Sequence, residues 1–350
     1  MLHTWREKEH SLRRFQRVNR TRLLPLCGLL LVCLLTFMLA GCRDIRQAAT
    51  EQDTAYEVTD AQGTVVKMPA KPQRILTLSM STDETVLGLV PPDKMAAVND
   101  LLDDPVSSNV VPLARQVKGR IKDPSVEEIA ALQPDLVIVP DWGDLTRVAS
   151  LRDLGIPVVV CKGARNLAEI EETVRLIAQA VGEPERGDKL VGMMEEKLAA
   201  IQEMVKAIPE NERKSVVLLS LMSTYGGSGS SFDEACKYAG VINGRARAGI
   251  RDGQEMSKEQ LVAINPDVLF LPTYNNHGNY DVASARDRYL SDPSLRTLRA
   301  IREEHLMEPD EAYIYNCSQD FVFGVQEIAY RVYGDAFHQE AGEHLSAVDD

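Results

Sequence analysis

One phrase in the hydrophobic pattern occurs twice, 132 positions apart. It is SVEEIAALQPDLVIVP at 125–140 and SKEQLVAINPDVLFLP at 257–272. In each copy the opening serine is followed three positions later by Glu128 or Gln260, which is the capping-box signature of a helix start. A Pro-Asp turn and a continuous apolar run follow, and such a run is typical of a parallel strand covered on both faces. The repeat therefore predicts two lobes built to one plan.

Strand-like and helix-like segments alternate along the rest of the chain, which is typical of βαβ units on a mostly parallel sheet. A hairpin is expected at 56–69, with further strands at 74–79, 96–99, 156–161, 215–221 and 312–316. Helices are expected at 82–89, 145–154, 167–181, 232–239, 295–301 and 321–333, and a loop at 103–124.

A single amphipathic segment, 184–208, separates the two halves. Its apolar positions share one helical stripe: Leu190, Met193, Met194, Leu198, Ile201, Val205 and Ile208. Pro184 suits the first turn of this helix, and Pro209 stops it. We therefore expect an α/β fold in which two similar lobes with mostly parallel sheets, 56–183 and 209–350, are joined by one long helix. A single rigid helix allows only limited closing motion between the lobes.

The first 41 residues depart from this pattern. Seven basic and two acidic residues precede an apolar run at 23–40, which ends in Leu-Ala-Gly-Cys. This order is typical of a secretory signal peptide, and the last four residues look like a bacterial lipobox, which implies that Cys42 is lipidated. An uncleaved membrane anchor is the alternative, because a run of 18 residues just reaches across a bilayer. Both interpretations place the globular part outside the cytoplasm, with 42–55 as its tether.

Charge and cysteine content narrow the possible partners. The formal net charge is −13, and −18 once 1–41 is removed. Nucleic acid is not expected, because a phosphate backbone requires a basic footprint. Besides Cys42, the mature chain has Cys161, Cys236 and Cys317, none with C-x-x-C spacing. We expect buried free thiols, with one disulfide as the alternative.

Three stretches together resemble a known family. They are DAQGTVVKMPAKPQRILTLS at 60–79, FDEACKYAGVINGRA at 232–246, and the repeated phrase. Their order on one lipobox-bearing chain is similar to the substrate-binding lipoproteins of ABC importers for ferric siderophores, haem and cobalamin. The resemblance runs over about 56–333 and implies a ligand cleft between the lobes and delivery to a membrane permease with its ATPase. It also implies that Glu127 and Glu259 dock onto permease arginines. The alternative is that both acids only complement a helix dipole.

Candidate ligand-binding residues follow from the rule that ligands of open α/β sheets lie beyond the carboxyl ends of strands. The rule selects Ser79, Met80, Ser81, Trp142, Tyr225, Gly226, Gly227, Tyr274, Asn275, Asn276 and Asn316. Trp142 and Tyr274 keep the offset of the repeat and are expected to face each other across the cleft. Arg147, Arg245 and Arg247 are further candidates for binding an anionic chelate.

The expected ligand is a metal chelate, with a ferric siderophore ahead of cobalamin and haem, because aromatic faces with amide and hydroxyl donors suit such molecules. Haem would take an axial ligand from Tyr225, Tyr274, Tyr280 or His277. A bare-metal site and a resident cofactor are not expected, because the mature chain has few histidines.

An enzyme is the main alternative from another class. Residues 226–230, GGSGS, nearly match the G-x-S-x-G nucleophile elbow around Ser228, but the last position is serine. No H-E-x-x-H motif or phosphate-binding glycine loop with lysine occurs. Catalysis is therefore not expected. A lipid-anchored serine hydrolase and a non-transport sensor stay open as alternatives, because fold does not fix function.

Overall fold

The computed structural model describes residues 55–273 and 281–348, and each half of this range is built around a parallel sheet. The first half contains the strands β3 Ile75–Thr77, β4 Met95–Asn99, β5 Arg120–Ile121, β6 Leu136–Pro140 and β7 Val158–Cys161. The second contains β8 Ser215–Leu218, β9 Ile242–Asn243, β10 Val268–Phe270 and β11 Leu306–Met307. The strand orders are β5-β4-β3-β6-β7 and β11-β10-β8-β9, and every neighbouring pair is parallel. The expected pair of parallel α/β lobes is confirmed.

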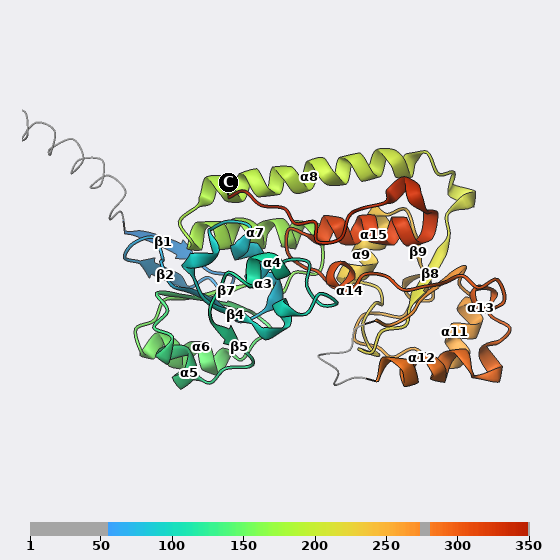
Figure 1. Cartoon of the computed structure of the whole chain (residues 1–350), viewed down its shortest axis with the longest axis horizontal. Helices are drawn as coiled ribbons and strands as arrows, with labels where there is room; N and C mark the ends of the chain where they lie inside the picture. The colour runs from blue at the N-terminus through green and yellow to red at the C-terminus, as the bar shows by residue number, and fades with distance from the viewer. Residues whose placement is uncertain (1–54, 274–280, 349–350) are drawn as a thin grey trace, which may run out of the picture. The chain divides into compact units, whose positions relative to one another are not determined.

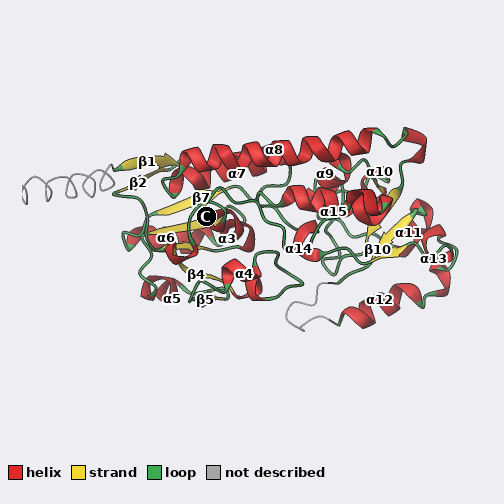
Figure 2. Ribbon diagram, turned by 45° about the horizontal axis from the view of Figure 1, so that its top comes forward, coloured by secondary structure: helices red, strands yellow, loops and turns green. Residues whose placement is uncertain are grey.

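Helices cover both faces of each sheet (Figures 1 and 2). The first lobe has α3 Met80–Leu87, α4 Val111–Ala114, α5 Val126–Ala131, α6 Leu145–Asp153 and α7 Leu167–Ala180, and its opening hairpin is β1 Tyr56–Thr59 with β2 Val65–Met68. The second lobe has α9 Ser231–Tyr238, α10 Gly244–Arg247, α11 Lys258–Ile264, α12 Val282–Leu290, α13 Arg299–Arg302, α14 Glu311–Ile314 and α15 Phe321–Tyr333. Short 3₁₀ turns are η1 Pro92–Lys94, η2 Asp100–Asp103, η3 Glu210–Glu212, η4 Pro293–Leu295 and η5 Asp335–Phe337.

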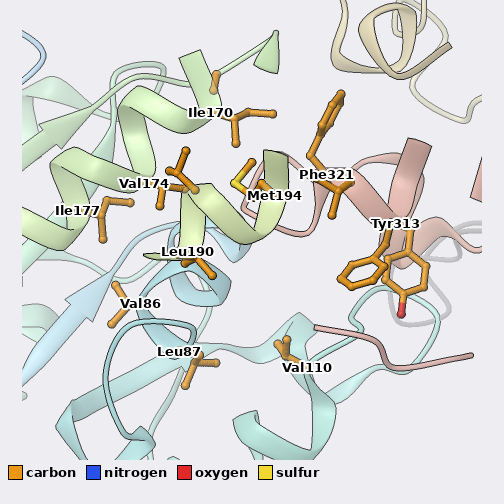
Figure 3. Close-up of a cluster of buried hydrophobic side chains, with 14 of the residues drawn as sticks. Val86, Leu87, Val110, Ile170, Val174, Ile177, Leu190, Met194, Tyr313 and Phe321 are labelled. Carbon is orange, nitrogen blue, oxygen red and sulfur yellow. The ribbon is translucent and has the colours of Figure 1, made fainter. Parts of the chain in front are cut away.

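The long helix α8, Pro184–Lys206, connects the lobes and covers one face of both (Figure 1). At 1.5 Å per residue its 23 residues span about 35 Å. Its buried side chains include the predicted stripe from Leu190 to Val205, although Met193 is only half buried. Met194 lies between Val174 of α7 and Phe321 of α15, so one hydrophobic core continues from lobe to lobe (Figure 3). A separate core fills the opposite face of each sheet, against α5 and α6 in the first lobe and α11 and α13 in the second.

Both copies of the repeated phrase begin with the predicted capping box. The Ser125 hydroxyl accepts the Glu128 N–H at 3.2 Å, and the Glu128 carboxylate accepts the Ser125 N–H at 2.7 Å. Ser257 and Gln260 make the same exchange at 3.2 and 2.8 Å. The two helices α5 and α11 therefore start in the same way, each with an acid in its first turn.

The aspartate of each Pro-Asp turn attaches the phrase to the first strand of its sheet. Asp135 accepts the N–H groups of Gln73 and Arg74 at 2.7 and 2.8 Å. Asp267 accepts the N–H and the hydroxyl of Ser215 at 2.8 and 2.7 Å. The strands held in this way are neighbours in the sheets, β3 with β6 and β8 with β10. Each carboxylate therefore helps to fix the register of the two neighbouring strands. The general preference for aspartate in turns would not by itself explain these contacts.

A second correspondence between the lobes lies at the end of the next strand. The Asn99 backbone N–H donates to Asp83 at 2.9 Å, and the Asn243 side chain donates to Asp233 at 3.1 Å. Each asparagine also accepts, through Oδ1, the N–H two residues further on, at 3.0 and 3.1 Å. Both lobes thus join the helix after their first strand to the end of their second strand.

Burial raises the pKa of Asp83 from its usual 3.8 to about 8, although Thr77 and the Asn99 N–H stabilise the charged form. Between these two pKa values the unfolded chain releases this proton and the folded chain keeps it. Folding stability therefore falls as pH rises from about 4 to 8, by at most about 1.4 kcal/mol per pH unit from this group. We expect Asp83→Asn to unfold at higher denaturant concentration than wild type at pH 7.5, and this advantage to shrink toward pH 5. An advantage that does not vary with pH would contradict the assignment.

Some predicted elements are wrong. Residues 312–316 were expected to form a strand, but α14 lies there, and the Asp310 carboxylate accepts the Ala312 N–H at its start at 3.0 Å. The edges of the second sheet are β11 and β9 instead. The helix expected at 295–301 is divided into η4 and α13, and the loop expected at 103–124 contains α4 and β5.

The C-terminal segment returns to the first lobe. The Ala347 N–H donates to the Gly88 carbonyl at 2.8 Å, and the Asn109 side chain donates to the Glu343 carbonyl at 2.8 Å. The boundaries predicted from sequence assign 209–350 to the second lobe, whereas its last turns also contact the first. The predicted signal peptide and Cys42 lie outside the described residues. Within the described ranges, no helix has the length and apolarity needed to cross a membrane.

Candidate functional site

A cleft of about 270 Å³ lies between the lobes at the carboxyl ends of the first strands of both sheets. In the first sheet, the strand order reverses between β3 and β6, and such a switch point is where open α/β sheets bind ligands. Residues that follow β3, β6 and β7 form the wall of the first lobe. The wall of the second lobe is formed by Tyr225, Ser230, Ser231, Asp252, Tyr315 and Cys317. Many of the lining residues carry hydroxyl groups: Ser79, Ser81, Thr82, Thr85, Ser230 and Ser231.

Two helices begin at the cleft, one from each lobe. Ser79 caps α3 by accepting the Thr82 N–H at 3.3 Å, and Ser230 caps α9 by accepting the Asp233 N–H at 3.1 Å. Helix N-termini carry partial positive charge and favour anions. Both caps lie on the cleft surface, and the first turn of α9 also carries the carboxylates of Asp233 and Glu234, which offset its partial positive charge.

Trp142 follows β6 and is 69% exposed, with its indole on the cleft surface. A Cβ on Gly163 would lie 2.2 Å from the indole Cδ1, so only glycine lets the ring rest against this backbone. The Gly163 N–H donates to Asp141 at 2.9 Å and fixes the loop. The indole is therefore supported on one face and available to a ligand on the other.

Two cations, Lys162 and Arg165, follow β7 on the same wall. Lys162 lies 3.4 Å from Glu172 in an exposed pair, which is worth little in water. Arg165 is exposed, and among the described residues no hydrogen bond or ion pair engages its guanidinium. Opposite them stands Asp252, which accepts the Gly226 N–H at 3.3 Å. One wall is thus cationic.

Tyr225 and Tyr315 form the aromatic part of the second lobe's wall, with ring centroids 5.0 Å apart. Their hydroxyls are engaged, Tyr225 with Ser231 at 2.9 Å and Tyr315 with Ser220 at 2.8 Å. Burial raises the pKa of both phenols well above the usual 10. Burial also raises the pKa of the neighbouring Cys317 thiol. Across the residues that the structure describes, no three His, Cys, Asp or Glu side chains converge to hold a metal ion.

The sequence rule placed several residues at this cleft. Ser79, Ser81, Trp142 and Tyr225 line it. Met80 instead packs half buried against the core, and Asn316 is buried with its amide 2.9 Å from the Glu84 carboxyl. Gly226 and Gly227 do not line it either. Five further candidates lie outside the described residues: Tyr274, Asn275, Asn276, His277 and Tyr280.

The three arginines proposed from sequence do not reach the cleft. Arg147 pairs with Asp123 at 2.9 Å, and Arg247 is exposed elsewhere. Arg245 is buried, and its guanidinium donates to three backbone carbonyls, those of Ser223, Tyr225 and Gln254. The positive charges come from Lys162 and Arg165, which follow a strand that was correctly predicted. The carboxyl-end rule, applied to that strand as well, would have selected them.

The serine in the near-match to a nucleophile elbow has no catalytic partner among the described residues. The Ser228 N–H donates to the Ile250 carbonyl at 2.8 Å. The described histidines are occupied elsewhere: His305 with Asp267 and Glu303, His338 with Glu340, and His344 with Asp320. Cys161, Cys236 and Cys317 are free thiols, as predicted. The first two are buried, and Cys317 is half buried.

Sequence comparisons agree with this architecture. The family described as "Periplasmic binding protein" matches residues 75–313. An uncharacterised ABC transporter substrate-binding lipoprotein of Bacillus subtilis (strain 168) is 25% identical over 86% of this chain and 95% of its own length. A vitamin B12-binding protein of Vibrio parahaemolyticus is 26% identical over 66% and 87%, respectively. A Fe(3+)-citrate-binding protein of Bacillus subtilis (strain 168) is 23% identical over 81% and 87%.

Among solved structures, the fold is similar to that of a periplasmic haem-binding protein from Roseiflexus sp. RS-1 in its apo form. The TM-score is 0.64 with 24% sequence identity, over 75% of this chain and 98% of that one. At this identity the likeness shows the two-lobe fold alone.

Proposed function

The chain belongs to the periplasmic binding protein family, and from this premise we propose that it is the substrate-binding component of an ABC importer for a metal chelate. The relatives support this class, because they are binding proteins of ABC transporters that span most of this chain. The partner is accordingly a permease with its ATPase. The arrangement at the cleft is one of binding rather than of catalysis, since no nucleophile and base meet there among the described residues.

The ligand that fits best is a compact, anionic ferric chelate with oxygen donors. The observation that carries this proposal is the cationic wall formed by Lys162 and Arg165 in a cleft that is otherwise lined largely with hydroxyls. The N-terminus of α3 also lies at this cleft and favours an anion. Hydroxyl donors and guanidinium groups bind carboxylate oxygens strongly. Trp142 supplies an apolar face for the body of the chelate.

Haem and cobalamin fit this cleft less well. Haem iron needs an axial ligand, and the hydroxyls of the described phenols Tyr225 and Tyr315 are already hydrogen-bonded to Ser231 and Ser220. An axial ligand would have to come from Tyr274, His277 or Tyr280. Cobalamin is much larger than the drug-sized ligands that fill cavities of about 300–1,000 Å³, and this cleft has about 270 Å³.

The proposed function also requires that the protein is attached to the membrane and contacts the permease. A lipid on Cys42 would hold the protein outside the cytoplasm at the membrane, as the lipobox predicts and as the name of a relative indicates for that protein. Glu127 and Glu259 are exposed at equivalent places, one in the first turn of α5 and one in the first turn of α11. We place the permease contacts there, one on each lobe.

The fluorescence of Trp142 can report which ligand the protein binds. The sequence has two tryptophans, Trp5 and Trp142, so residues 42–350 without lipid carry Trp142 alone. We expect ferric citrate to quench its fluorescence with micromolar or tighter affinity, because the indole lies on the cleft surface. Haemin and cyanocobalamin, tested in the same way and by their absorption spectra, should bind more weakly. Tighter binding of either would replace the proposed ligand, and no binding of any of the three would contradict the metal-chelate assignment.

A further inference from the structure

The residues after α15 form a strap that reaches from the second lobe to the first. This C-terminal strap consists of residues 339–348, and its end lies beside α8 (Figure 1). At the second lobe, Gln339 Nε2 donates to the Phe323 carbonyl of α15 at 3.1 Å. At the first lobe, the Ala347 N–H donates to the Gly88 carbonyl at 2.8 Å, and Ala347 is 1% exposed in the hydrophobic core shared with α8. The strap is therefore fixed at both ends.

One buried side chain, that of Asp320, joins both lobes to the strap. Asp320 directly precedes α15 in the second lobe and is fully buried. Its Oδ1 accepts the Leu345 N–H of the strap at 2.9 Å, and its Oδ2 lies 2.6 Å from His344 Nδ1. Oδ2 also accepts the amide of Asn109 from the first lobe at 2.7 Å, and this amide donates to the Glu343 carbonyl at 2.8 Å. Separating these parts would leave buried polar groups without partners, which is costly.

A glycine allows the strap to pass close to the first lobe. Gly88 follows the last turn of α3, and a Cβ at this position would lie 2.9 Å from the Leu345 carbonyl oxygen and 3.0 Å from Gln319 Nε2. Gln319 Nε2 in turn donates to the Glu84 carbonyl of α3 at 3.0 Å. The strap, α3 and the segment before α15 thus meet at one place, and any side chain at Gly88 would push them apart.

These contacts involve the segments that form both walls of the cleft. Helix α3 carries Ser81 and Thr85 of the first wall, and Tyr315 and Cys317 of the second wall shortly precede Asp320. The strap is thus a second link between the lobes besides α8. A change in the angle between the lobes has to stretch or break the contacts of the strap at one of its ends.

We propose that the C-terminal strap limits the opening of the two lobes and thereby slows release of the ligand. The part of this inference that concerns release rests on the proposed function, because the ligand is that of the same cleft. With the strap detached from the first lobe, the lobes are held together by α8 and by fewer hydrogen bonds. The cleft then opens more often, and the ligand leaves faster.

The first variant detaches the end of the strap. Ala347→Asp places a charge at a buried position, and burying an unpaired charge is so unfavourable that the end of the strap should leave the first lobe. Ala341→Asp is the matched control, because it makes the same change at an exposed position of the same strap. Neither residue lines the cleft, so the contacts with the ligand are the same in both variants. Circular dichroism checks that both are folded.

Lobe motion can be measured without ligand. Leu154→Cys at the end of α6 and Val262→Cys on α11 place exposed spin labels, one in each lobe. Cys42→Ser and Cys317→Ser prevent labelling elsewhere in the mature chain, because the other two cysteines are buried. We expect the distribution of distances between the labels to be broader with Ala347→Asp than in wild type and unchanged in the control variant. The same distribution in all three proteins would overturn the proposal.

Release of ferric citrate is followed by the recovery of Trp142 fluorescence after rapid dilution of the complex. We expect Ala347→Asp to release the chelate about tenfold faster than wild type, and Ala341→Asp to release it at the wild-type rate. Equal acceleration in both variants, or a broader distance distribution with unchanged release, would contradict the role of the strap in release. Failure of ferric citrate to bind wild type would overturn the proposed ligand, and the label distances would still decide whether the strap limits opening.

A second variant displaces the strap without adding a charge and decides the matter if Ala347→Asp does not fold. Gly88→Ala adds a Cβ that would lie 2.9 Å from the Leu345 carbonyl oxygen, so the strap has to move. Gly192→Ala on α8 is its matched control, because a Cβ there would have nothing within 4 Å. We expect Gly88→Ala to broaden the label distances and to speed release at least about threefold, and the control to change neither. A folded Gly88→Ala protein with wild-type distances and release would refute the proposal.

Discussion

Replacing Glu127 and Glu259 together by alanine is expected to lower uptake of the ligand at least about tenfold while leaving its affinity unchanged. Removing one member of a charge pair at an interface typically costs about 2–5 kcal/mol, and the double variant removes one on each lobe. Neither residue lines the cleft, so binding should be intact. Uptake of radiolabelled iron by cells, with Trp142 fluorescence on the purified variant, measures the two quantities separately.

Glu127 and Glu259 have equivalent surroundings in the two lobes. Each follows the serine of a capping box that is already complete through Glu128 or Gln260, so neither is needed to start its helix. Hydrogen bonds from its own N–H and from Ser257 lower the pKa of Glu259, which keeps it charged. Both helices lie against the sheet faces opposite α8 (Figure 1). That face can meet two subunits at once, one through each lobe.

Glu185 provides a matched control for the docking pair. It is an exposed glutamate in the first turn of α8, on the other side of the sheets. Glu185→Ala removes the same interaction with a helix dipole, worth about 0.3–1 kcal/mol, without touching the proposed docking face. Uptake should stay at the wild-type level. Equal loss in Glu185→Ala and the double variant, or normal uptake in the double variant, would contradict docking through Glu127 and Glu259.

Most of the fold followed from local patterns. The apolar runs of the repeat and the serines that start their helices are set by neighbours in sequence, and both formed as predicted. The segment 312–316 failed because a short apolar run fits a strand or a buried helix equally well. The Asp310 cap and the position of β11 at the edge decided for a helix. The return of the C-terminal segment to the first lobe depends on contacts such as Ala347 with Gly88, which no local pattern encodes.

The site was predictable where strand ends determine it. Ser81 and Trp142 lie at the cleft because they follow buried parallel strands. The position of a strand end does not determine where a long side chain points. Arg245 comes shortly after a strand, yet its guanidinium is bound to backbone carbonyls and stays inside the second lobe. Asn316 was expected to meet the ligand and instead meets Glu84, because that partner lies 232 positions away.

The second large effect is expected from Lys162→Ala combined with Arg165→Ala. Hydrogen bonds to charged groups contribute about 1.5–3 kcal/mol each, so losing two should weaken binding of ferric citrate about a hundredfold or more. The Lys162 pair with Glu172 is exposed and spans only the edge of α7, so stability should hardly change. Fluorescence titration of Trp142 gives the affinity, and thermal unfolding checks the fold.

A control variant and a second, neutral chelate distinguish whether Lys162 and Arg165 act through their charge or through their shape. Arg147→Ala removes an arginine of the same lobe that pairs with Asp123 away from the cleft, and it should bind ferric citrate as wild type does. A neutral ferric hydroxamate offers no carboxylate to Lys162 and Arg165. If the double variant loses affinity for the neutral and the anionic chelate equally, the cationic wall acts through shape alone. A selective loss for the anionic chelate is the outcome that the unengaged Arg165 guanidinium predicts.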